Sequence, residues 1–160
     1  MSSSNEGATA GFLVWRLSMR WRVAVDRAVA PLGLTHAQYV VVASLYGMSR
    51  SGLRPSQRRL AEHTGLEALY VSKLARALET AGLVARTRDP DDPRAMQLSL
   101  TEQGRDVARR AITVVQGLLD QLLEPLGGQD DPRTRRFTRE LATLLDAPLD
   151  PYTENDEEQS

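Results

Sequence analysis

Hydrophobic residues recur at spacings of three and four over residues 12–30, which predicts an amphipathic helix. A proline and a glycine end this helix, and Thr35 with Gln38 forms a capping box at the start of the next one. The stretch Tyr39–Tyr46 is almost wholly apolar, so we expect this second helix to be buried on most sides. Residues 47–52 are expected to form a loop.

A pair of short helices follows, separated by a tight turn. Ser56 is a suitable N-cap for the first helix, which the Thr64–Gly65 pair ends. The second helix ends at Gly82. Its inward face consists of Val71, Leu74, Ala75 and Leu78. Two helices joined by so short a glycine-containing turn indicate a helix-turn-helix.

The hydrophobic period then changes from helical to alternating. Residues 96–100 alternate between apolar and polar, as a half-buried strand does, and residues 83–88 are the expected partner strand. The segment 89–94 between them is charged and contains two prolines, which no helix would tolerate. The pattern predicts a β-hairpin with a charged tip.

Two helices are expected after the hairpin, and they carry more apolar surface than one small domain needs. Thr101 caps the first, which reaches about residue 124, and Asp131 with Pro132 begins the second. The chain from Asp150 onward is polar and acidic.

The expected fold class is therefore mainly α with a small β-hairpin wing. It is a winged helix-turn-helix flanked by N-terminal and C-terminal helices. In chain order we expect a flexible N-terminus (1–10), a helical arm (11–34), the winged helix-turn-helix (35–100), two further helices (101–147) and an acidic, disordered tail (148–160).

The formal net charge of −1 conceals a basic middle and an acidic tail. Residues 50–110 carry a net charge of +4 and the remainder carries −5, with six acidic residues in the last 15 positions. The basic residues fall on both helices of the helix-turn-helix and on the hairpin, where they could face DNA phosphates. The charge distribution alone is also consistent with a solvated surface that carries scattered charges and does not face DNA.

The composition excludes several classes of function. There is no cysteine, which removes disulfides, thiolate catalysis and oxidant sensing through thiols, and two histidines are too few for a His-rich metal site. An enzyme using His36 or His63 with nearby carboxylates is the competing class, but no nucleophile motif or glycine-rich phosphate loop is present. We expect no catalytic residue, no metal and no cofactor. No apolar run reaches the length of a membrane span and residues 1–11 lack a signal-peptide pattern, so the cytoplasm is the expected location.

Four motifs stand in order along the chain. They are Gly33-Leu34-Thr35-x-x-Gln38, Leu60-Ala61-x-x-x-Gly65-Leu66, Leu78-Glu79-x-x-Gly82-Leu83-Val84-x-Arg86, and Asp89-Pro90-x-Asp92-x-Arg94-x-x-x-x-x-Leu100-Thr101-x-x-Gly104. In order and spacing they resemble the MarR family of winged helix-turn-helix transcriptional regulators, and the resemblance extends from residue 12 to about residue 146.

The resemblance implies a homodimer in which the helices of 11–34 and 101–147 are the dimerisation helices. Such a dimer binds a pseudo-palindromic DNA operator, most often as a repressor, and is displaced by a small aromatic or phenolic ligand. The alternative is a winged-helix module without an effector, which binds DNA non-specifically or binds a protein partner.

The expected DNA contacts lie on both helices of the helix-turn-helix and on the hairpin. The first helix would clamp phosphate with Ser56, Gln57 and Arg58. The second would use Lys73, Arg76 and Ser72 for phosphate or base edges, and Leu69 and Tyr70 for thymine methyls or sugars. The hairpin would add Arg86, Arg88 and Arg94.

Two positions depart from the family pattern. Glu67 stands where many relatives have the serine or threonine that caps the recognition helix. The hairpin tip has Asp92-Pro93-Arg94 in place of the common Asp-Arg-Arg. In the family, one arginine of this triplet enters the minor groove. Here either Arg94 or Arg88 makes that contact instead, or the wing binds phosphate only. A third interpretation is that Arg94 pairs with a hairpin aspartate.

By position, an effector pocket would be bordered by Trp15, Met19, Arg20, His36 and Tyr39. The competing interpretations are helix packing for Trp15 and Met19, a solvated or interface charge for Arg20, and an exposed first-turn residue for His36. If His36 does face the ligand, anion binding would depend on pH, because the unperturbed histidine pKa is about 6.5.

Overall fold

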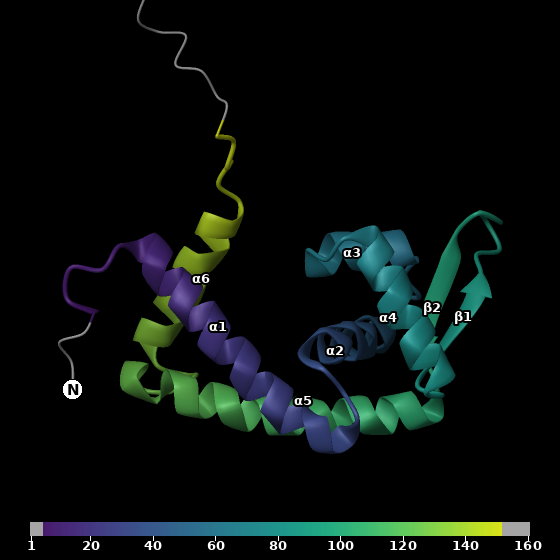
Figure 1. Ribbon diagram of the computed structural model, residues 1–160, viewed down its shortest axis with the longest axis horizontal. Coiled ribbons are helices and arrows are strands. Elements are labelled where there is room, and N and C mark those ends of the chain that lie inside the picture. The colour runs from purple at the N-terminus through teal and green to yellow at the C-terminus, as the bar shows by residue number, and fades with distance from the viewer. Residues whose placement is uncertain (1–4, 152–160) are drawn as a thin grey trace, which may run out of the picture. The chain divides into compact units, whose positions relative to one another are not determined.

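The computed structural model describes residues 5–151, whose main elements are six α-helices and one two-stranded hairpin (Figure 1). The elements are α1 (Ala10–Val29), η2 (Ala30–Leu32), α2 (His36–Arg50), α3 (Gln57–Thr64), α4 (Ala68–Thr80), β1 (Val84–Arg88), β2 (Met96–Leu100), α5 (Glu102–Leu123), η3 (Glu124–Leu126) and α6 (Pro132–Leu145). The mainly helical order with one antiparallel hairpin confirms the expected fold class.

The helix starts that the sequence predicted are formed by the predicted side chains. The Gln38 amide donates to Thr35 Oγ1 at 3.2 Å, and the Thr35 amide donates to Gln38 Oε1 at 3.0 Å, which completes the capping box of α2. The Arg59 amide donates to Ser56 Oγ at 3.1 Å at the start of α3. These caps satisfy amides that the first turn of a helix leaves without a partner.

The expectation of a loop over residues 47–52 is wrong for its first part, because α2 continues to Arg50. Met48 packs against the core, and this contact extends the helix past the exposed Gly47. The chain turns at Gly52, whose φ of +73° lies in the left-handed region that glycine adopts without strain.

The hairpin is joined to the helix-turn-helix by backbone hydrogen bonds. β1 pairs antiparallel with β2, with Val84 opposite Leu100 and Arg86 opposite Leu98. The segment just before α3 pairs with the other side of β2, where the Leu98 amide donates to the Pro55 carbonyl at 2.9 Å. This pairing was not expected from the sequence, and it fixes the wing to the start of α3.

The chain divides within α5 into two compact units, Met1–Leu118 and Leu119–Ser160. In the first unit, helices α1 to α4, both strands and the N-terminal part of α5 contribute buried residues to a single hydrophobic core. Its largest fully buried side chains include Leu45, Leu60, Leu78 and Leu98. Burying each such side chain contributes about 1.5–3 kcal/mol, so this core is what holds the helix-turn-helix and the hairpin together.

The second unit contains the end of α5, η3 and α6. Asp131 caps α6 by accepting from the Arg133 amide at 2.8 Å, and Pro132 occupies the first helical position, as predicted.

Both chain ends extend beyond the described residues. The expected flexible N-terminus (1–10) and acidic tail (148–160) fall partly on residues 1–4 and 152–160, which lie outside the described part. α1 begins at Ala10, and its N-cap Thr9 accepts from the Phe12 amide at 3.3 Å. Within the described part no single helix is long and apolar enough to cross a membrane; α1 with η2, taken together with α2, meets that criterion only as a pair bent by 76°.

Candidate nucleic-acid interface

The outward side of α4 carries most of the side chains that the sequence analysis assigned to DNA. Its inward face is fixed in the core by Val71, Leu74, Ala75 and Leu78. Lys73 and Arg76 are therefore turned outward and exposed, while Ser72 is half-buried. Leu69 is 81% exposed and Tyr70 is 44% exposed. A helix that presents cationic, hydroxyl and aromatic groups on one accessible face suits entry into a major groove.

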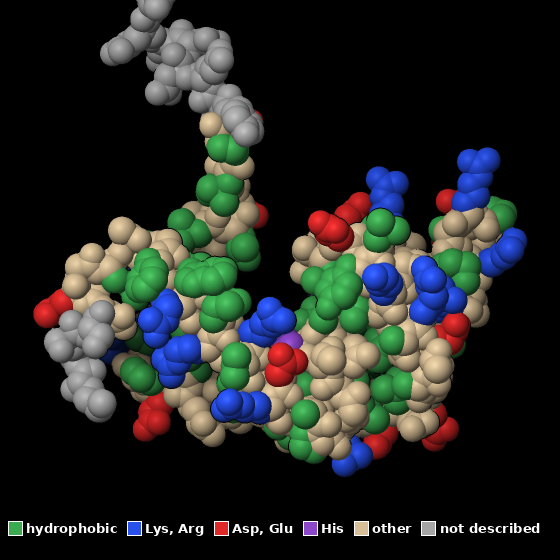
Figure 2. Space-filling model, viewed as in Figure 1, with side chains coloured by type: hydrophobic (Ala, Val, Ile, Leu, Met, Phe, Trp, Pro, Cys, Tyr) green, Lys and Arg blue, Asp and Glu red, His purple; other side chains and the backbone are tan. Residues whose placement is uncertain are grey.

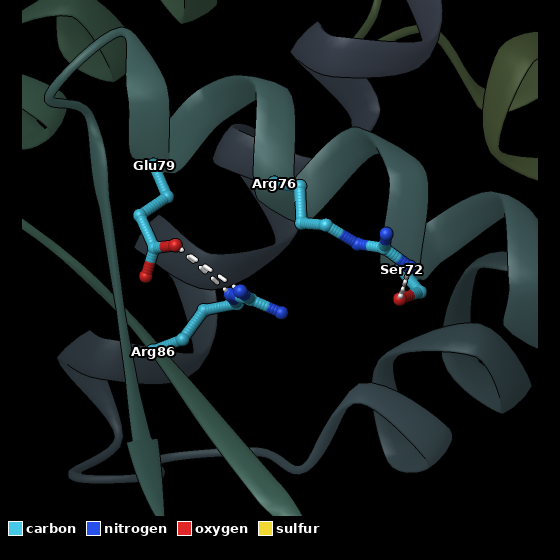
Figure 3. Close-up of polar contacts among 4 residues, drawn as sticks. All are labelled: Ser72, Arg76, Glu79 and Arg86. Carbon is cyan, nitrogen blue, oxygen red and sulfur yellow. Dashed lines mark hydrogen bonds and ion pairs between the residues drawn. The ribbon is translucent and has the colours of Figure 1, made fainter.

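Arg76 is held by a neighbouring side chain on the same helix. Its Nη2 atom donates to Ser72 Oγ at 3.1 Å, one helical turn earlier (Figure 3). This bond aligns the guanidinium along the surface of α4, and it leaves the remaining N–H donors of Arg76 for another acceptor.

The start of α4 has no side-chain cap. Glu67 occupies the N-cap position, and its carboxylate makes no capping hydrogen bond. The negative charge still lies at the positive end of the helix dipole, which favours it. The departure from serine or threonine therefore costs the cap hydrogen bond but not the favourable charge.

The three residues predicted to bind phosphate at the start of α3 differ in how far their polar groups are free to do so. Ser56 uses its hydroxyl as the N-cap of α3. Gln57 is half-buried, and its Oε1 atom is shielded from solvent without a hydrogen-bond partner. Arg58 is 88% exposed in its side chain, and its Nε atom lies 3.3 Å from Glu62 Oε1. An exposed ion pair of this kind contributes little, so Arg58 can exchange Glu62 for a phosphate at small cost.

The hairpin holds its three arginines in different ways. Arg86 donates from Nε and Nη2 to Oε1 of Glu79 on α4, at 3.3 and 3.1 Å (Figure 3). Arg88 and Arg94 are exposed. Glu79 was not among the predicted site residues, although a signal was present: Arg86 lies two residues after the buried Val84, so both side chains are on the same face of β1.

The tip of the hairpin is fixed by its aspartates and not by an arginine side chain. Asp89 Oδ1 accepts from the Asp91 amide at 2.8 Å, and Asp92 Oδ1 accepts from the Arg94 amide at 3.0 Å. Within residues 5–151, Arg94 forms no ion pair with a hairpin aspartate, so that interpretation of Arg94 is wrong. The Arg94 side chain is left at the exposed tip.

The residues predicted to border an effector pocket are placed at different depths. Met19, His36 and Tyr39 are half-buried, while Arg20 is exposed and Trp15 is 57% exposed. The reading of His36 as an exposed first-turn residue is therefore wrong. Trp15 is exposed in the single chain, so helix packing for Trp15 stays a prediction about the proposed dimer.

Burial changes the titration of two of these residues. It lowers the pKa of His36 below its ordinary value, an effect that the Arg22 charge adds to and the Asp26 carboxylate opposes. It raises the pKa of the Tyr39 hydroxyl. Both side chains are thereby favoured in their neutral forms.

A different cavity lies beside the C-terminal half of α2. It has a volume of about 440 Å³, and it is lined by Ala43, Ser44, Gly47, Met48, Ser51, Leu53 and His63. None of the residues predicted to bind an effector lines it. Among the described residues, no cluster of three or more histidine, aspartate and glutamate side chains is arranged to hold a metal ion.

In Figure 2, lysine and arginine side chains project from α3, α4 and the hairpin, and others lie over α1. A short helix pair with an exposed second helix, followed by a hairpin that packs on that helix, defines a winged helix-turn-helix DNA-binding protein.

Residues 32–95 match the sequence model of the MarR family. The chain is 33% identical over 139 residues to the HTH-type transcriptional repressor Rv2887 of Mycobacterium tuberculosis. This aligned region covers 87% of this chain and 95% of Rv2887. It is 34% identical over 113 residues to the uncharacterized HTH-type transcriptional regulator YdcH of Bacillus subtilis, and this aligned region covers 71% of this chain and 77% of YdcH. The chain therefore belongs to the MarR family and is a DNA-binding transcriptional regulator, not an enzyme.

Solved structures with the same fold include complexes with DNA and with a small molecule. The transcriptional repressor CouR bound to a 23-mer DNA duplex is 28% identical, with a TM-score of 0.74 over 91% of this chain and 98% of CouR. The M. tuberculosis protein Rv2887 in complex with p-aminosalicylic acid is 31% identical, with a TM-score of 0.64 over 86% of this chain and 98% of Rv2887.

Proposed function

We propose that this protein is a cytoplasmic, homodimeric repressor that binds a pseudo-palindromic operator through two copies of α4. The observation that carries the proposal is the exposed face of α4, where Lys73 and Arg76 point away from the core beside a wing with two exposed arginines. Two such faces, about one turn of DNA apart, would read related half-sites.

Exposed apolar surface on the two helical arms supports the dimer. On α1, the exposed large hydrophobic residues are Phe12, Leu13, Val14, Trp15, Leu17 and Val23. On α6, they are Phe137, Leu141, Leu144 and Leu145. Exposed apolar surface of this extent favours burial against another chain. A second copy of the same helices would provide that surface through a two-fold contact.

The proposed roles at the DNA follow from exposure and partners. Arg76 would contact a guanine edge, and Lys73 would contact phosphate. Leu69 and Tyr70 would contact thymine methyls or sugars, and Arg58 would contact phosphate beside them. On the wing, Arg88 and Arg94 are the exposed cations, and we assign them to phosphate.

The proposed effector is a small aromatic or phenolic anion, bound near Trp15, Met19, Arg20, His36 and Tyr39. The complex of Rv2887 with p-aminosalicylic acid supports this class of ligand. Titration with salicylate while monitoring the fluorescence of Trp15 and Trp21 tests it. We expect a saturable change together with a loss of operator affinity; no change at millimolar concentration would contradict the effector.

The decisive experiment is binding to the promoter region of the protein's own gene against competitor DNA at a stated salt concentration. A specific regulator binds its operator at least about 10³-fold more tightly than random DNA. Sedimentation of the free protein at micromolar concentration gives the oligomeric state in parallel. Equal affinity for both DNAs would instead support a non-specific winged-helix module, and a monomer would contradict the two-half-site arrangement.

A further inference from the structure

The ion pair between Glu79 and Arg86 joins the two parts of the DNA-binding surface. Glu79 lies in the last turn of α4, and Arg86 is the central residue of β1. We infer that Arg86 is a positioning residue, which fixes the wing against the recognition helix and neutralises Glu79, and that it does not contact phosphate. This inference rests on the proposed operator binding and refines it.

The geometry favours a fixed pair over a mobile one. Two nitrogens of the Arg86 guanidinium converge on one oxygen of Glu79, at 3.3 and 3.1 Å. The two side chains come from elements that pack on each other, α4 and β1. Because the pair spans the boundary between helix and hairpin, it restrains the angle at which the wing leaves α4.

Burial distinguishes Arg86 from the other arginines of the hairpin. Its side chain is 22% exposed and that of Glu79 is 41% exposed, whereas Arg88 and Arg94 are exposed. In the strand register Arg86 stands opposite the buried Leu98, on the inward face of the hairpin. The two N–H groups of Arg86 that bond Glu79 could turn to a phosphate only by giving up both hydrogen bonds, and this would leave the Glu79 carboxylate unpaired beside the DNA backbone. The remaining N–H donors belong to a side chain that is only 22% exposed, which limits the access of a phosphate to them.

The pair also affects Arg76. Glu79 lies three residues after Arg76 on α4, a spacing at which a carboxylate and a guanidinium can pair. In the structure Glu79 is taken by Arg86, and Arg76 instead bonds Ser72, on the other side along the helix (Figure 3). Arg86 therefore keeps the carboxylate away from the arginine that we assign to base reading.

Charge reversal tests the inference. The single variant Arg86→Glu places two carboxylates together, and we expect it to weaken operator binding by about tenfold or more. The double variant Glu79→Arg/Arg86→Glu restores an ion pair of opposite direction, and we expect operator affinity to return to within about threefold of wild type. A double variant that binds no better than Arg86→Glu would overturn the inference.

Salt dependence separates positioning from phosphate contact. The double variant Glu79→Gln/Arg86→Gln keeps the local net charge and removes the ion pair. We expect it to lose operator affinity while the slope of log K against log salt stays as in wild type. The matched control Arg88→Ala should reduce that slope by about one, because it removes a phosphate contact. A reduction of the same size in the double glutamine variant would identify Arg86 as a phosphate contact instead.

Hydrogen exchange of the β1 amides supplies a readout without DNA. We expect faster exchange in Arg86→Glu and recovery in the charge-reversed double variant, with circular dichroism confirming that each variant is folded. Unchanged exchange in Arg86→Glu would contradict the positioning role. A wild-type protein without operator preference would instead contradict the proposed function, so the two failures are distinguishable.

Discussion

The carboxylate of Asp26 in α1 accepts a hydrogen bond from the backbone amide of His36, the first residue of α2, with a distance of 2.6 Å from N to Oδ1. The bond is partly buried and links residues ten positions apart. It satisfies an amide that the first turn of α2 would otherwise leave without a partner, and it places a negative charge at the positive end of the helix. The bond thereby ties a proposed dimerisation helix to the helix that supports the helix-turn-helix.

Removing the carboxylate of Asp26 should destabilise the fold. A hydrogen bond to a charged group contributes about 1.5–3 kcal/mol, so Asp26→Ala should lower the free energy of unfolding by about 1–2 kcal/mol, given the partial exposure of the site. Asp26→Asn retains an acceptor oxygen and should cost less. Urea denaturation followed by circular dichroism measures both. Equal losses in the two variants would show that the acceptor atom at this site is unimportant.

Stability should fall in mildly acidic solution through His36. Burial lowers its pKa in the folded state, so the unfolded chain binds a proton more readily than the folded chain. The contribution to stability is therefore complete above the unfolded pKa of about 6.5 and is lost as the pH falls through and below that value. We expect His36→Gln to show a weaker fall in the free energy of unfolding between about pH 7 and pH 5 than wild type. Parallel curves for the two proteins would contradict this origin.

Base reading by Arg76 should depend on Ser72. We expect Arg76→Ala to weaken operator binding by about 1–3 kcal/mol and binding to random DNA by much less. Ser72→Ala removes the hydrogen bond that aligns the guanidinium and should produce a smaller loss in the same direction. Fluorescence anisotropy with operator and random duplexes measures both. An equal loss on the two duplexes would show that Arg76 contacts phosphate only.

Gly104 should tolerate no side chain. It is buried in the first turn of α5, and a Cβ atom there would collide with the carbonyl group of Leu83. We expect Gly104→Ala to lower the free energy of unfolding by about 2 kcal/mol or more, because backbone must move to relieve the collision.

Gly117 is the matched control for Gly104 on the same helix. It is exposed, and a Cβ atom there would meet no atom within 4 Å beyond its chain neighbours and the backbone of its own helix. Gly117→Ala should be neutral or should stabilise the helix by about 0.5–1 kcal/mol. Thermal unfolding of the two variants side by side measures the difference. A Gly104→Ala variant that melts at the wild-type temperature would refute the collision argument.

The proposed dimer should be sensitive to charge on the apolar face of α6. Leu141 and Leu144 are exposed in the single chain, so replacing both with glutamate should leave the monomer folded and lower the dimer affinity by about 100-fold or more. Thr143→Glu adds charge on another side of the helix and should preserve the dimer. Sedimentation velocity over a range of concentrations distinguishes the variants, and unchanged dimerisation of the leucine variant would place the interface elsewhere.

Features set by neighbouring residues could be predicted from the sequence. Thr35, Ser56 and Asp131 cap the helices that they were expected to cap, and the charged segment between the two strands forms the hairpin tip. The outward position of Lys73 and Arg76 was predictable too, since the spacing of the apolar residues fixes which side of α4 meets the core. These features depend on side-chain to backbone bonds and on helix period, which operate within a few residues.

Only the tertiary structure decided which partners the polar side chains take. The sequence places Arg86 among the basic residues of the wing, but the packing of β1 on α4 brings it to Glu79. In the same way α2 extends beyond Gly47 because Met48 meets the core, and Asp26 reaches His36 because α1 and α2 pack together. Local sequence sets the direction of each side chain, whereas the choice among possible partners depends on which elements the common hydrophobic core brings into contact.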